Sequence, residues 1–505
     1  MKNFSKILFV FFLLVPFSCS DFLDLKPQNI LTQEAFPKSA ADALQATNAT
    51  YATLRNWFYH SGGYPILDIM SDDARKGSNP DDQRPTVGPY DNFTHNASQD
   101  GLDRWWAAVY EGIKRANVVI NAVPLVEMDE NLKNRYVGEA KFLRALFYFD
   151  LVRAWGGVPI VTEVTAEFKI PRATAAQVYS LIETDLQDAI QVLPKKSEYG
   201  IADLGRATQG AAQALLGKVH LYQGEFEEAE DLLLEVIDSD EYDLESDFDD
   251  AFGAETENGI ESVFEIGARL NEGTNNGGNQ WGNVQGIRGT PNRGWGFNRP
   301  SVDLINSFET GDPRREATVI FLGETMPDGV VTLGDGTTPD ETRDAQNNLI
   351  EIECYNQKVW TPGETVPPGN NTITSWGHNR RIIRYADVLL MAAEALNENS
   401  KSTEALIYLN QVRQRAREGN NAILPDINIT DKTQLRDIIL NERRYELAME
   451  SHRYWDLVRH IGRSTSALQK LQSLGFVQGK HELFPIPQNE FDLAQGNFEQ
   501  NPNWD

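Results

Sequence analysis

Cysteine is nearly absent from this chain, whose 505 residues include two, Cys19 and Cys354. A fold held together by several disulfides is therefore excluded. If Cys19 is modified, as its surroundings indicate below, no disulfide can form within the chain. We expect the fold to rest on packing, and the chain is long enough to bury a large core.

Basic residues are also scarce. The sequence has 46 Lys and Arg against 74 Asp and Glu, which gives a formal net charge of −28. Proteins that bind nucleic acid need an excess of cationic side chains to neutralise phosphates, so a nucleic-acid partner is excluded. The charge also makes a strongly anionic ligand less natural, unless Arg or Lys residues collect locally.

Signatures of catalysis and metal binding are missing as well. The sequence contains no His-Glu-x-x-His, no Gly-x-Ser-x-Gly and no phosphate-binding loop. Acidic pairs are too numerous to identify a glycosidase couple. Asp243-x-Glu245-x-Asp247 hints at calcium, but Phe248 and Ala254 stand where an EF-hand needs Gly and Glu. We therefore predict no enzyme activity, no metal and no cofactor.

One apolar run stands at the amino end, and no second run of about 20 residues occurs. Ile7–Val15 is wholly apolar and follows two lysines, which is the layout of a secretory signal peptide and too short for a membrane span. Ser18 and Cys19 then match the cleavage site of a bacterial lipoprotein, whose thiol carries a diacylglycerol. We predict a signal peptide over residues 1–18 and a lipid anchor at Cys19. The alternative is a secreted protein with a chance cysteine.

Helical periodicity marks three stretches, about 40–57, 102–240 and 380–460. Gly138–Trp155 is strongly periodic, and Thr174 is a plausible N-cap for a helix that ends at Val192.

A repeat pattern is recognisable inside these stretches. Gly217, Gly224, Phe226 and Ala229 fall where a tetratricopeptide repeat has its close-packing glycine, turn glycine, aromatic and second-helix alanine. Tyr385–Ala416 has the same spacing between its small residues. This pattern favours a short helical solenoid over a generic helical bundle.

The segments between the helices are long and rich in Gly, Asn, Pro and aromatics: about 58–100, 267–299 and 310–379. They are too long for simple connections and too aromatic for disorder. We expect them to form a layer on the helical scaffold, with a few short strands, and to carry the binding residues. Residues 19–505 would form a single domain.

Seven segments of the chain match, in order, the recurrent segments of one family. The matching segments are Cys19–Pro27, Gly138–Val161, Gly294–Pro300, Arg384–Ala395, Glu442–Ala448, Arg453–Arg459, and Leu483–Pro487 with Gln500–Pro502. The chain thereby resembles the SusD/RagB family of outer-membrane lipoproteins from Bacteroidota. Charged residues in these segments, such as Glu442, Arg443 and Glu446, are expected to form ion pairs between packed helices.

The resemblance implies a mainly α-helical protein, with about four tetratricopeptide-like helix pairs and an irregular ligand-binding layer. It also implies a surface glycan-binding protein on the extracellular face of the outer membrane. In this family the protein acts as a lid over a SusC-like TonB-dependent transporter and delivers oligosaccharide to it, while the lipid at Cys19 holds the lid.

A glycan site needs exposed aromatic rings beside amide, carboxylate or guanidinium groups. The family's ligand residues have no fixed motif here, so candidates come from the aromatic-rich loops, with Trp281 first. The predicted ligand-binding residues are Trp281, Tyr90, Trp295, Trp376, Tyr64, Asn283 and Arg288.

The net charge favours a neutral polysaccharide such as a β-glucan or another plant or algal glycan. An anionic glycan remains an alternative ligand, because Arg288, Arg293 and Arg299 lie close together in the sequence. The alternatives are a peptide-capturing lid of the RagB type, a surface glycan hydrolase, and a structural brace for the transporter with no ligand of its own.

Overall fold

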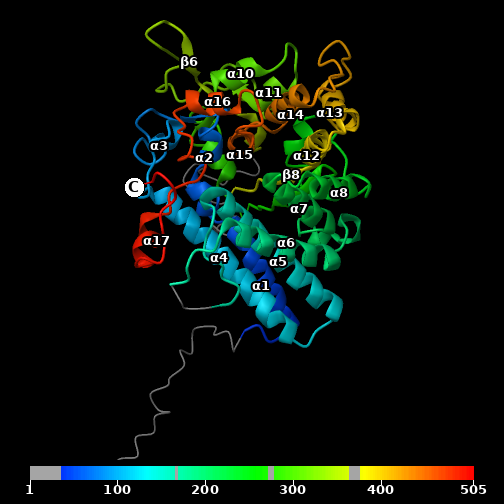
Figure 1. The fold of residues 1–505 in the computed structure, drawn as a ribbon. Helices are drawn as coiled ribbons and strands as arrows, with labels where there is room; N and C mark the ends of the chain where they lie inside the picture. Colours follow the sequence, from blue (N-terminus) through cyan, green and yellow to red (C-terminus); the bar gives the residue numbers. More distant parts are fainter. Residues whose placement is uncertain (1–35, 165–168, 271–277, 363–375, 505) are drawn as a thin grey trace, which may run out of the picture.

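The computed structural model describes residues 36–164, 169–270, 278–362 and 376–504. The predicted signal peptide and Cys19 lie outside these ranges. Over the described residues the structure is mainly helical, and the predicted fold class is confirmed (Figure 1).

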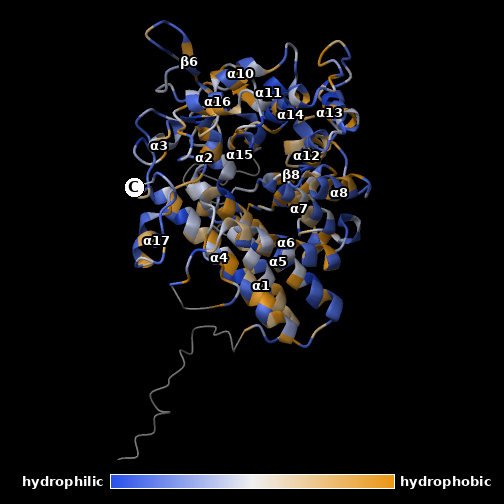
Figure 2. Ribbon diagram, viewed as in Figure 1, coloured by the Kyte–Doolittle hydropathy of each residue, from blue (hydrophilic) through white to orange (hydrophobic). Residues whose placement is uncertain are grey.

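Long helices form the scaffold. They are α1 (Ala40–Leu54), α4 (Asp100–Ala122), α5 (Glu130–Trp155), α6 (Ala175–Val192), α7 (Gln209–Gln223), α8 (Phe226–Ile237), α12 (Tyr385–Glu398), α13 (Ser402–Ala416) and α14 (Lys432–Leu447). Helices adjacent in sequence pack together, as in α4 with α5, α7 with α8, and α12 with α13. Apolar residues gather where α1, α4 and α5 lie side by side (Figure 2). No helix of the described residues is long and apolar enough to cross a bilayer.

The repeat glycines act as predicted. A Cβ on Gly217 would lie 2.8 Å from Cγ of Leu233, so the glycine lets α7 and α8 approach closely. Gly224 ends α7 in the left-handed conformation, with φ +80°, which favours glycine. Ala229, on α8, is fully buried. Residues 209–237 therefore form the helical hairpin that the sequence predicts.

Two helix boundaries differ from the prediction. α1 is closed at its start by a capping box on Ser39 but ends at Leu54, three residues before Trp57. α5 begins at Glu130 rather than Gly138, because the carboxylate of Asp129 accepts a hydrogen bond from a first-turn amide. The predicted N-cap of α6 is confirmed, since Thr174 forms a capping box.

The interhelical segments form an irregular layer with short strands, as predicted. The strands pair two by two, all antiparallel: β1 (Ala74–Gly77) with β3 (Phe297–Pro300), β2 (Ser262–Ile266) with β8 (Arg380–Arg384), β4 (Val319–Phe321) with β7 (Cys354–Asn356), and β5 (Glu341–Arg343) with β6 (Leu349–Ile352). Short helices complete the layer and the carboxyl end: α2 (Ile66–Ile69), α3 (Gly88–Asp91), α9 (Trp281–Gln285), α10 (Val302–Ser307), α11 (Arg314–Thr318), α15 (Arg453–Arg459), α16 (Ala467–Ser473) and α17 (Gln488–Leu493).

Buried ion pairs join the layer to the helices. Glu442 on α14 pairs with Arg314 of the layer at 2.8 Å and with Arg413 of α13 at 2.6 Å. Arg443 pairs with Asp387 of α12 and with Asp456 of α15, each at 2.8 Å. The predicted interhelical ion pairs are thus confirmed. The guanidinium groups of Arg314, Arg413 and Arg443 are therefore buried and paired with carboxylates inside the protein.

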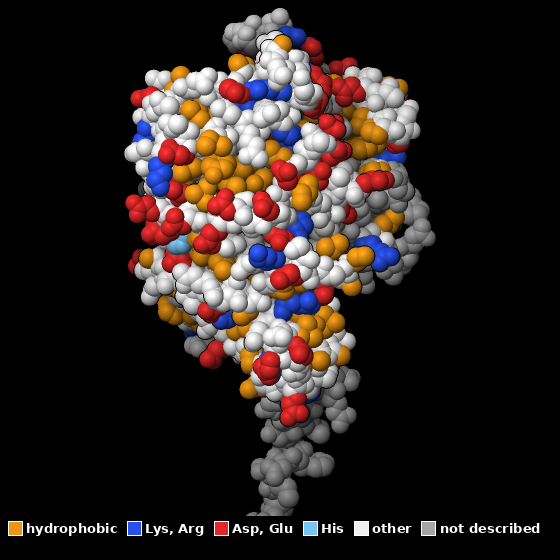
Figure 3. Space-filling model, turned by 90° about the vertical axis from the view of Figure 1, so that its right-hand side faces the viewer, with side chains coloured by type: hydrophobic (Ala, Val, Ile, Leu, Met, Phe, Trp, Pro, Cys, Tyr) orange, Lys and Arg blue, Asp and Glu red, His pale blue; other side chains and the backbone are white. Residues whose placement is uncertain are grey.

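The outer surface carries charges of both signs. On the face in Figure 3, acidic and basic side chains are interspersed with apolar ones, and no single sign covers it. This face therefore offers no broad cationic patch to a polyanion.

Candidate functional site

Trp281, the first predicted ligand residue, is buried in α9 with 6% of its side chain exposed. The guanidinium carbon of Arg380 lies 3.7 Å from the ring centre, and the ring of His60 lies 5.4 Å away. The indole face is thus already covered by a cation, an arrangement that stabilises packing. The prediction that Trp281 offers an open ring is wrong.

Three other predicted residues are also buried: Tyr90 is 1% exposed, and Trp376 and Asn283 are fully buried. Tyr90 stacks on His95 with ring centres 5.1 Å apart. The backbone of Trp376 pairs with that of Asn279 through hydrogen bonds of 3.0 and 3.1 Å. Aromatic and amide residues in these loops hold the layer together, and these three offer no surface to a ligand.

The other three predicted residues do come together. Tyr64, Trp295 and Arg288 line one surface hollow of about 540 Å³, a size typical of ligand pockets. We call it the aromatic hollow. Its full lining is Trp57, Tyr64, Asp82, Gln83, Arg288, Gly289, Asn292, Gly294, Trp295, Phe297 and Asp335.

Three half-buried rings define the apolar part of the aromatic hollow. The ring centre of Trp57 lies 6.0 Å from that of Trp295 and 6.2 Å from that of Tyr64, with the planes tilted by 68° and 61°. Tyr64 in turn packs edge-on against the buried ring of Phe297 at 5.0 Å. The rings thus meet edge to face, and all three line the hollow.

Local backbone geometry fixes Trp57. Its indole nitrogen donates a hydrogen bond to the carbonyl of Gly63 at 2.6 Å. A Cβ on Gly63 would lie 2.6 Å from that nitrogen, and its φ of +104° favours glycine. Trp57 also stacks on Phe58 with ring centres 5.3 Å apart, and Arg104 lies over the Phe58 ring. The Trp57 ring is therefore held in place by its own protein contacts before any ligand arrives.

Close backbone packing positions Trp295. Its amide donates to the carbonyl of Asn283 at 2.8 Å, and the amide of Gly296 donates to the carbonyl of Gly286 at 3.0 Å. Gly294 packs so tightly that a Cβ would lie 2.5 Å from the Asn283 carbonyl oxygen. Asn283, which the sequence predicts as a ligand residue, is thus buried and supports the Trp295 ring through its backbone carbonyl.

Arg288 is the polar centre of the aromatic hollow. Its Nη1 donates to Asp82 at 2.8 Å and to Ser78 at 2.6 Å, and its Nε pairs with Asp335 at 2.9 Å. About a third of the side chain is exposed. No hydrogen bond joins Nη2 to any residue that the structure describes, so this group can donate outward.

Of the two carboxylates beside Arg288, that of Asp335 is held as an ionised acceptor. Burial alone would raise the pKa of Asp335, but hydrogen bonds from the amides of Thr338 and Thr337 lower it to about 2. Burial and the neighbouring Asp82 raise the pKa of Tyr64 to about 12, which keeps its hydroxyl neutral. The hollow therefore offers aromatic rings, a neutral hydroxyl, a guanidinium donor and carboxylate acceptors.

Sequence reasoning missed Trp57, Asp82 and Asp335. Trp57 was placed inside a helix, yet it opens a run of three aromatics just after the helix ends, which was an available signal. Asp335 accepts a hydrogen bond from the amide of Thr338 within its own turn, and it also pairs with Arg288. The ion pair joins residues 288 and 335, which are far apart in the sequence, so no local pattern predicts it.

Comparison with known proteins identifies the family. A model of the SusD family matches residues 260–504, and a model described as starch-binding associating with outer membrane matches residues 21–221. SusD-like protein P2 of Formosa agariphila is 30% identical over the full length of both chains. A SusD-like protein of Bacteroides ovatus is 27% identical over 87% of this chain and 79% of that protein.

Solved structures agree. A laminarin-binding SusD-like protein superposes with a TM-score of 0.78 and 30% identity, covering 93% of this chain and 100% of the other. Surface glycan-binding protein A from Bacteroides thetaiotaomicron, in complex with laminarihexaose, superposes with a TM-score of 0.74 and 26% identity over 92% of this chain and 100% of that one. With both halves matched by family models and a relative aligned end to end, the chain belongs to the SusD family, as its sequence motifs predict.

Proposed function

We propose that this protein captures a neutral glycan of the laminarin class in the aromatic hollow and passes it to a SusC-like TonB-dependent transporter. The observation that carries the proposal is the group of half-buried rings, Trp57, Tyr64 and Trp295, beside the anchored Arg288.

The rings suit a sugar because a pyranose presents an apolar face of C–H groups. That face can lie on an indole or phenol ring and exclude water from both. The rings of the hollow are already fixed by Gly63, Phe58 and Phe297, so binding orders few side chains.

The polar groups suit the hydroxyls. Asp82 and Asp335 can accept hydrogen bonds from hydroxyls, and Nη2 of Arg288 can donate one. Since two carboxylates already balance this guanidinium, the hollow has no uncompensated positive charge for an anionic glycan. A neutral glycan therefore fits better than an anionic one, and two structural relatives are described as binding laminarin or laminarihexaose.

The same groups argue against hydrolysis. A glycosidase needs one carboxylic acid with a raised pKa to protonate the leaving oxygen. The hollow is lined by two carboxylates, both paired with Arg288, and the pKa of Asp335 lies near 2. We therefore propose binding without turnover.

A lid that captures peptides would need a groove that offers backbone hydrogen-bonding partners, whereas this hollow is lined by aromatic rings.

The anchor and the partner complete the proposal. A lipid on Cys19 would hold the protein at the extracellular face of the outer membrane, since two or three acyl chains bind a bilayer firmly. The transporter would receive the glycan when the protein closes over it.

The direct test is calorimetric titration of the mature chain with laminarihexaose, for wild type, Trp57→Ala and Trp295→Ala. Removing one stacking ring should weaken binding by roughly tenfold or more, about 1.4 kcal/mol per factor of ten. Tyr408→Ala is the matched control, because it removes a half-buried ring from α13, outside the aromatic hollow.

The outcomes separate the alternatives. Unchanged affinity in both tryptophan variants would refute the site, and absence of binding to any glycan of a neutral and anionic panel would refute the function. Saturable binding of peptides instead would favour the peptide-capturing lid. Release of shorter oligosaccharides would indicate a hydrolase.

A further inference from the structure

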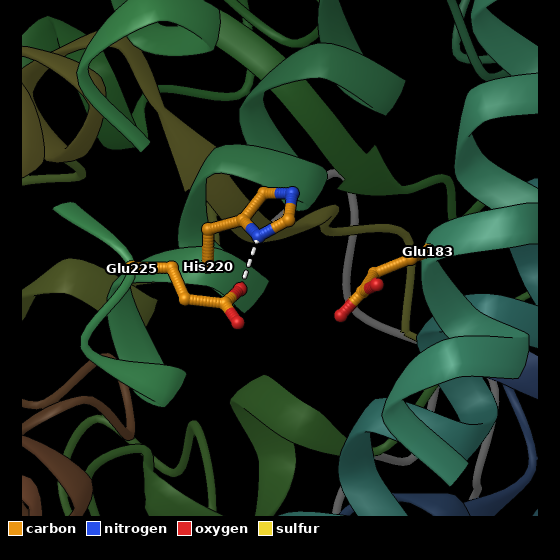
Figure 4. A group of neighbouring side chains, drawn as sticks. All are labelled: Glu183, His220 and Glu225. Carbon is orange, nitrogen blue, oxygen red and sulfur yellow. Dashed lines mark hydrogen bonds and ion pairs between the residues drawn. The ribbon is translucent and has the colours of Figure 1, made fainter. Parts of the chain in front are cut away.

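Three metal-ligating side chains meet away from the aromatic hollow, in the helical scaffold. Glu183 extends from α6, His220 from the last turn of α7, and Glu225 from the residue before α8 (Figure 4). One ligand atom from each lies within 4.8 Å of the other two. Nδ1 of His220 and Oε2 of Glu225 are 2.7 Å apart.

The backbone brings these residues together for a local reason. The left-handed turn at Gly224 reverses the chain, and the amide of Glu225 then donates to the carbonyl of His220 at 3.0 Å. The imidazole and the carboxylate are thereby placed side by side on a rigid hairpin. Glu183 faces them from the neighbouring helix, because α6 packs on α7.

The two carboxylates of this cluster have no lysine or arginine partner among the described residues, and the exposed Glu225 contacts the imidazole of His220. Glu183 accepts from the amide of Gln223 at 2.7 Å. Elsewhere on α6, Asp185 pairs with Arg144 at 2.7 Å and Asp188 pairs with a lysine. Glu183 is thus an exception on α6, where Asp185 and Asp188 each pair with a cation from another helix.

One imidazole and two carboxylates form a ligand set suited to zinc and similar divalent metals, with a fourth position left for water. In a tetrahedral zinc site with bonds of about 2.1 Å, ligand atoms lie roughly 3.4 Å apart. The cluster reaches this geometry if the half-buried Glu183 side chain closes in by roughly 1.4 Å and if Nδ1 of His220 and Oε2 of Glu225, now 2.7 Å apart, separate by roughly 0.7 Å. His220 is 8% exposed and already oriented.

We propose that Glu183, His220 and Glu225 bind one divalent transition-metal ion of the zinc type. The ion would neutralise the two carboxylates and tie α6 to the hairpin of α7 and α8. This site was not predicted from the sequence, because its residues lack a metal motif and Glu183 comes from a different helix.

The test is titration of the metal-free mature chain with ZnCl2 by calorimetry, with Co2+ absorption as a second readout. Wild type should bind one ion per chain, and its melting temperature should rise with zinc concentration. His220→Ala and Glu183→Gln should each weaken binding at least tenfold and abolish the rise. Glu228→Gln, which neutralises an exposed acid in the first turn of α8, should bind as wild type does.

Absence of saturable zinc and cobalt binding by wild type would overturn the proposal, as would undiminished binding by His220→Ala and Glu183→Gln. Glu183→Gln keeps the size of a half-buried side chain, so it also tests the site if the histidine variant fails to fold. Laminarihexaose binding should be unaffected by either variant, which separates this proposal from the proposed function.

Discussion

Replacing Glu450 by Gln should destabilise the protein strongly, because this carboxylate balances two buried cations. Lys358 Nζ lies 2.8 Å from Oε1, and Arg384 approaches both oxygens at 2.8 and 2.9 Å. The carboxylate side chain is 8% exposed. Gln keeps the shape but removes the charge, so the two cations lose a compensating partner.

The magnitude follows from the pKa shift of the same group. Burial alone would raise the pKa of Glu450, but Arg384 and Lys358 lower it from 4.5 to about 2. One pKa step corresponds to 1.36 kcal/mol, so this carboxylate contributes roughly 3 kcal/mol above its unfolded pKa. Breaking a buried ion pair typically costs about 3–5 kcal/mol, in agreement.

The assay is urea unfolding, followed by circular dichroism, of wild type and Glu450→Gln from pH 7 down to pH 3. Because the folded pKa is depressed, the stabilisation is complete above the unfolded pKa and is lost as the pH falls through 4.5 toward 2. The difference in free energy of unfolding should therefore shrink with acidification. Glu404→Gln, an exposed change on α13, should stay within about 0.5 kcal/mol at every pH. A loss below about 1 kcal/mol at pH 7, or a loss that does not vary with pH, would refute the reasoning.

Three further substitutions test the scaffold and the hollow. Gly217→Val should lower the free energy of unfolding by about 1–3 kcal/mol, measured by urea unfolding, because its side chain would collide with α8. Gly63→Ala should weaken laminarihexaose binding in calorimetry while the fold persists, since a Cβ there would displace the Trp57 ring; unchanged affinity would contradict this. Asp335→Asn should weaken binding by roughly tenfold, about 1.4 kcal/mol, by loosening Arg288, and equal affinity for both proteins would argue against that role.

The helical scaffold was predictable because its signals are local. Periodicity and the cap at Thr174 act within a few residues, and Gly217 acts on Leu233 of the helix that follows directly in sequence. The start of α5 was misjudged because Glu130 and its neighbours are polar, and an N-cap extended the helix beyond its apolar pattern. Local chemistry thus predicts where helices exist better than where they end.

The hollow was predictable only in part. Tyr64, Trp295 and Arg288 were identified from residue type, and the same criterion selected Trp281, which Arg380 covers. The local sequence around an aromatic residue in a loop does not show whether its ring faces solvent or is covered by a buried cation. Long-range pairing decides between the two, and a single sequence carries no record of it.

The buried ion pairs also have a consequence for how the chain is cross-linked. Arg453 joins Asp72 and Arg444 joins Asp73, across 381 and 371 positions of sequence, each at 2.7 Å. In many exported proteins disulfides make such long-range connections, but here the described residues include one cysteine, Cys354, and it is buried. These ion pairs form without any oxidant, so thiol reductants should leave the melting temperature of the protein unchanged.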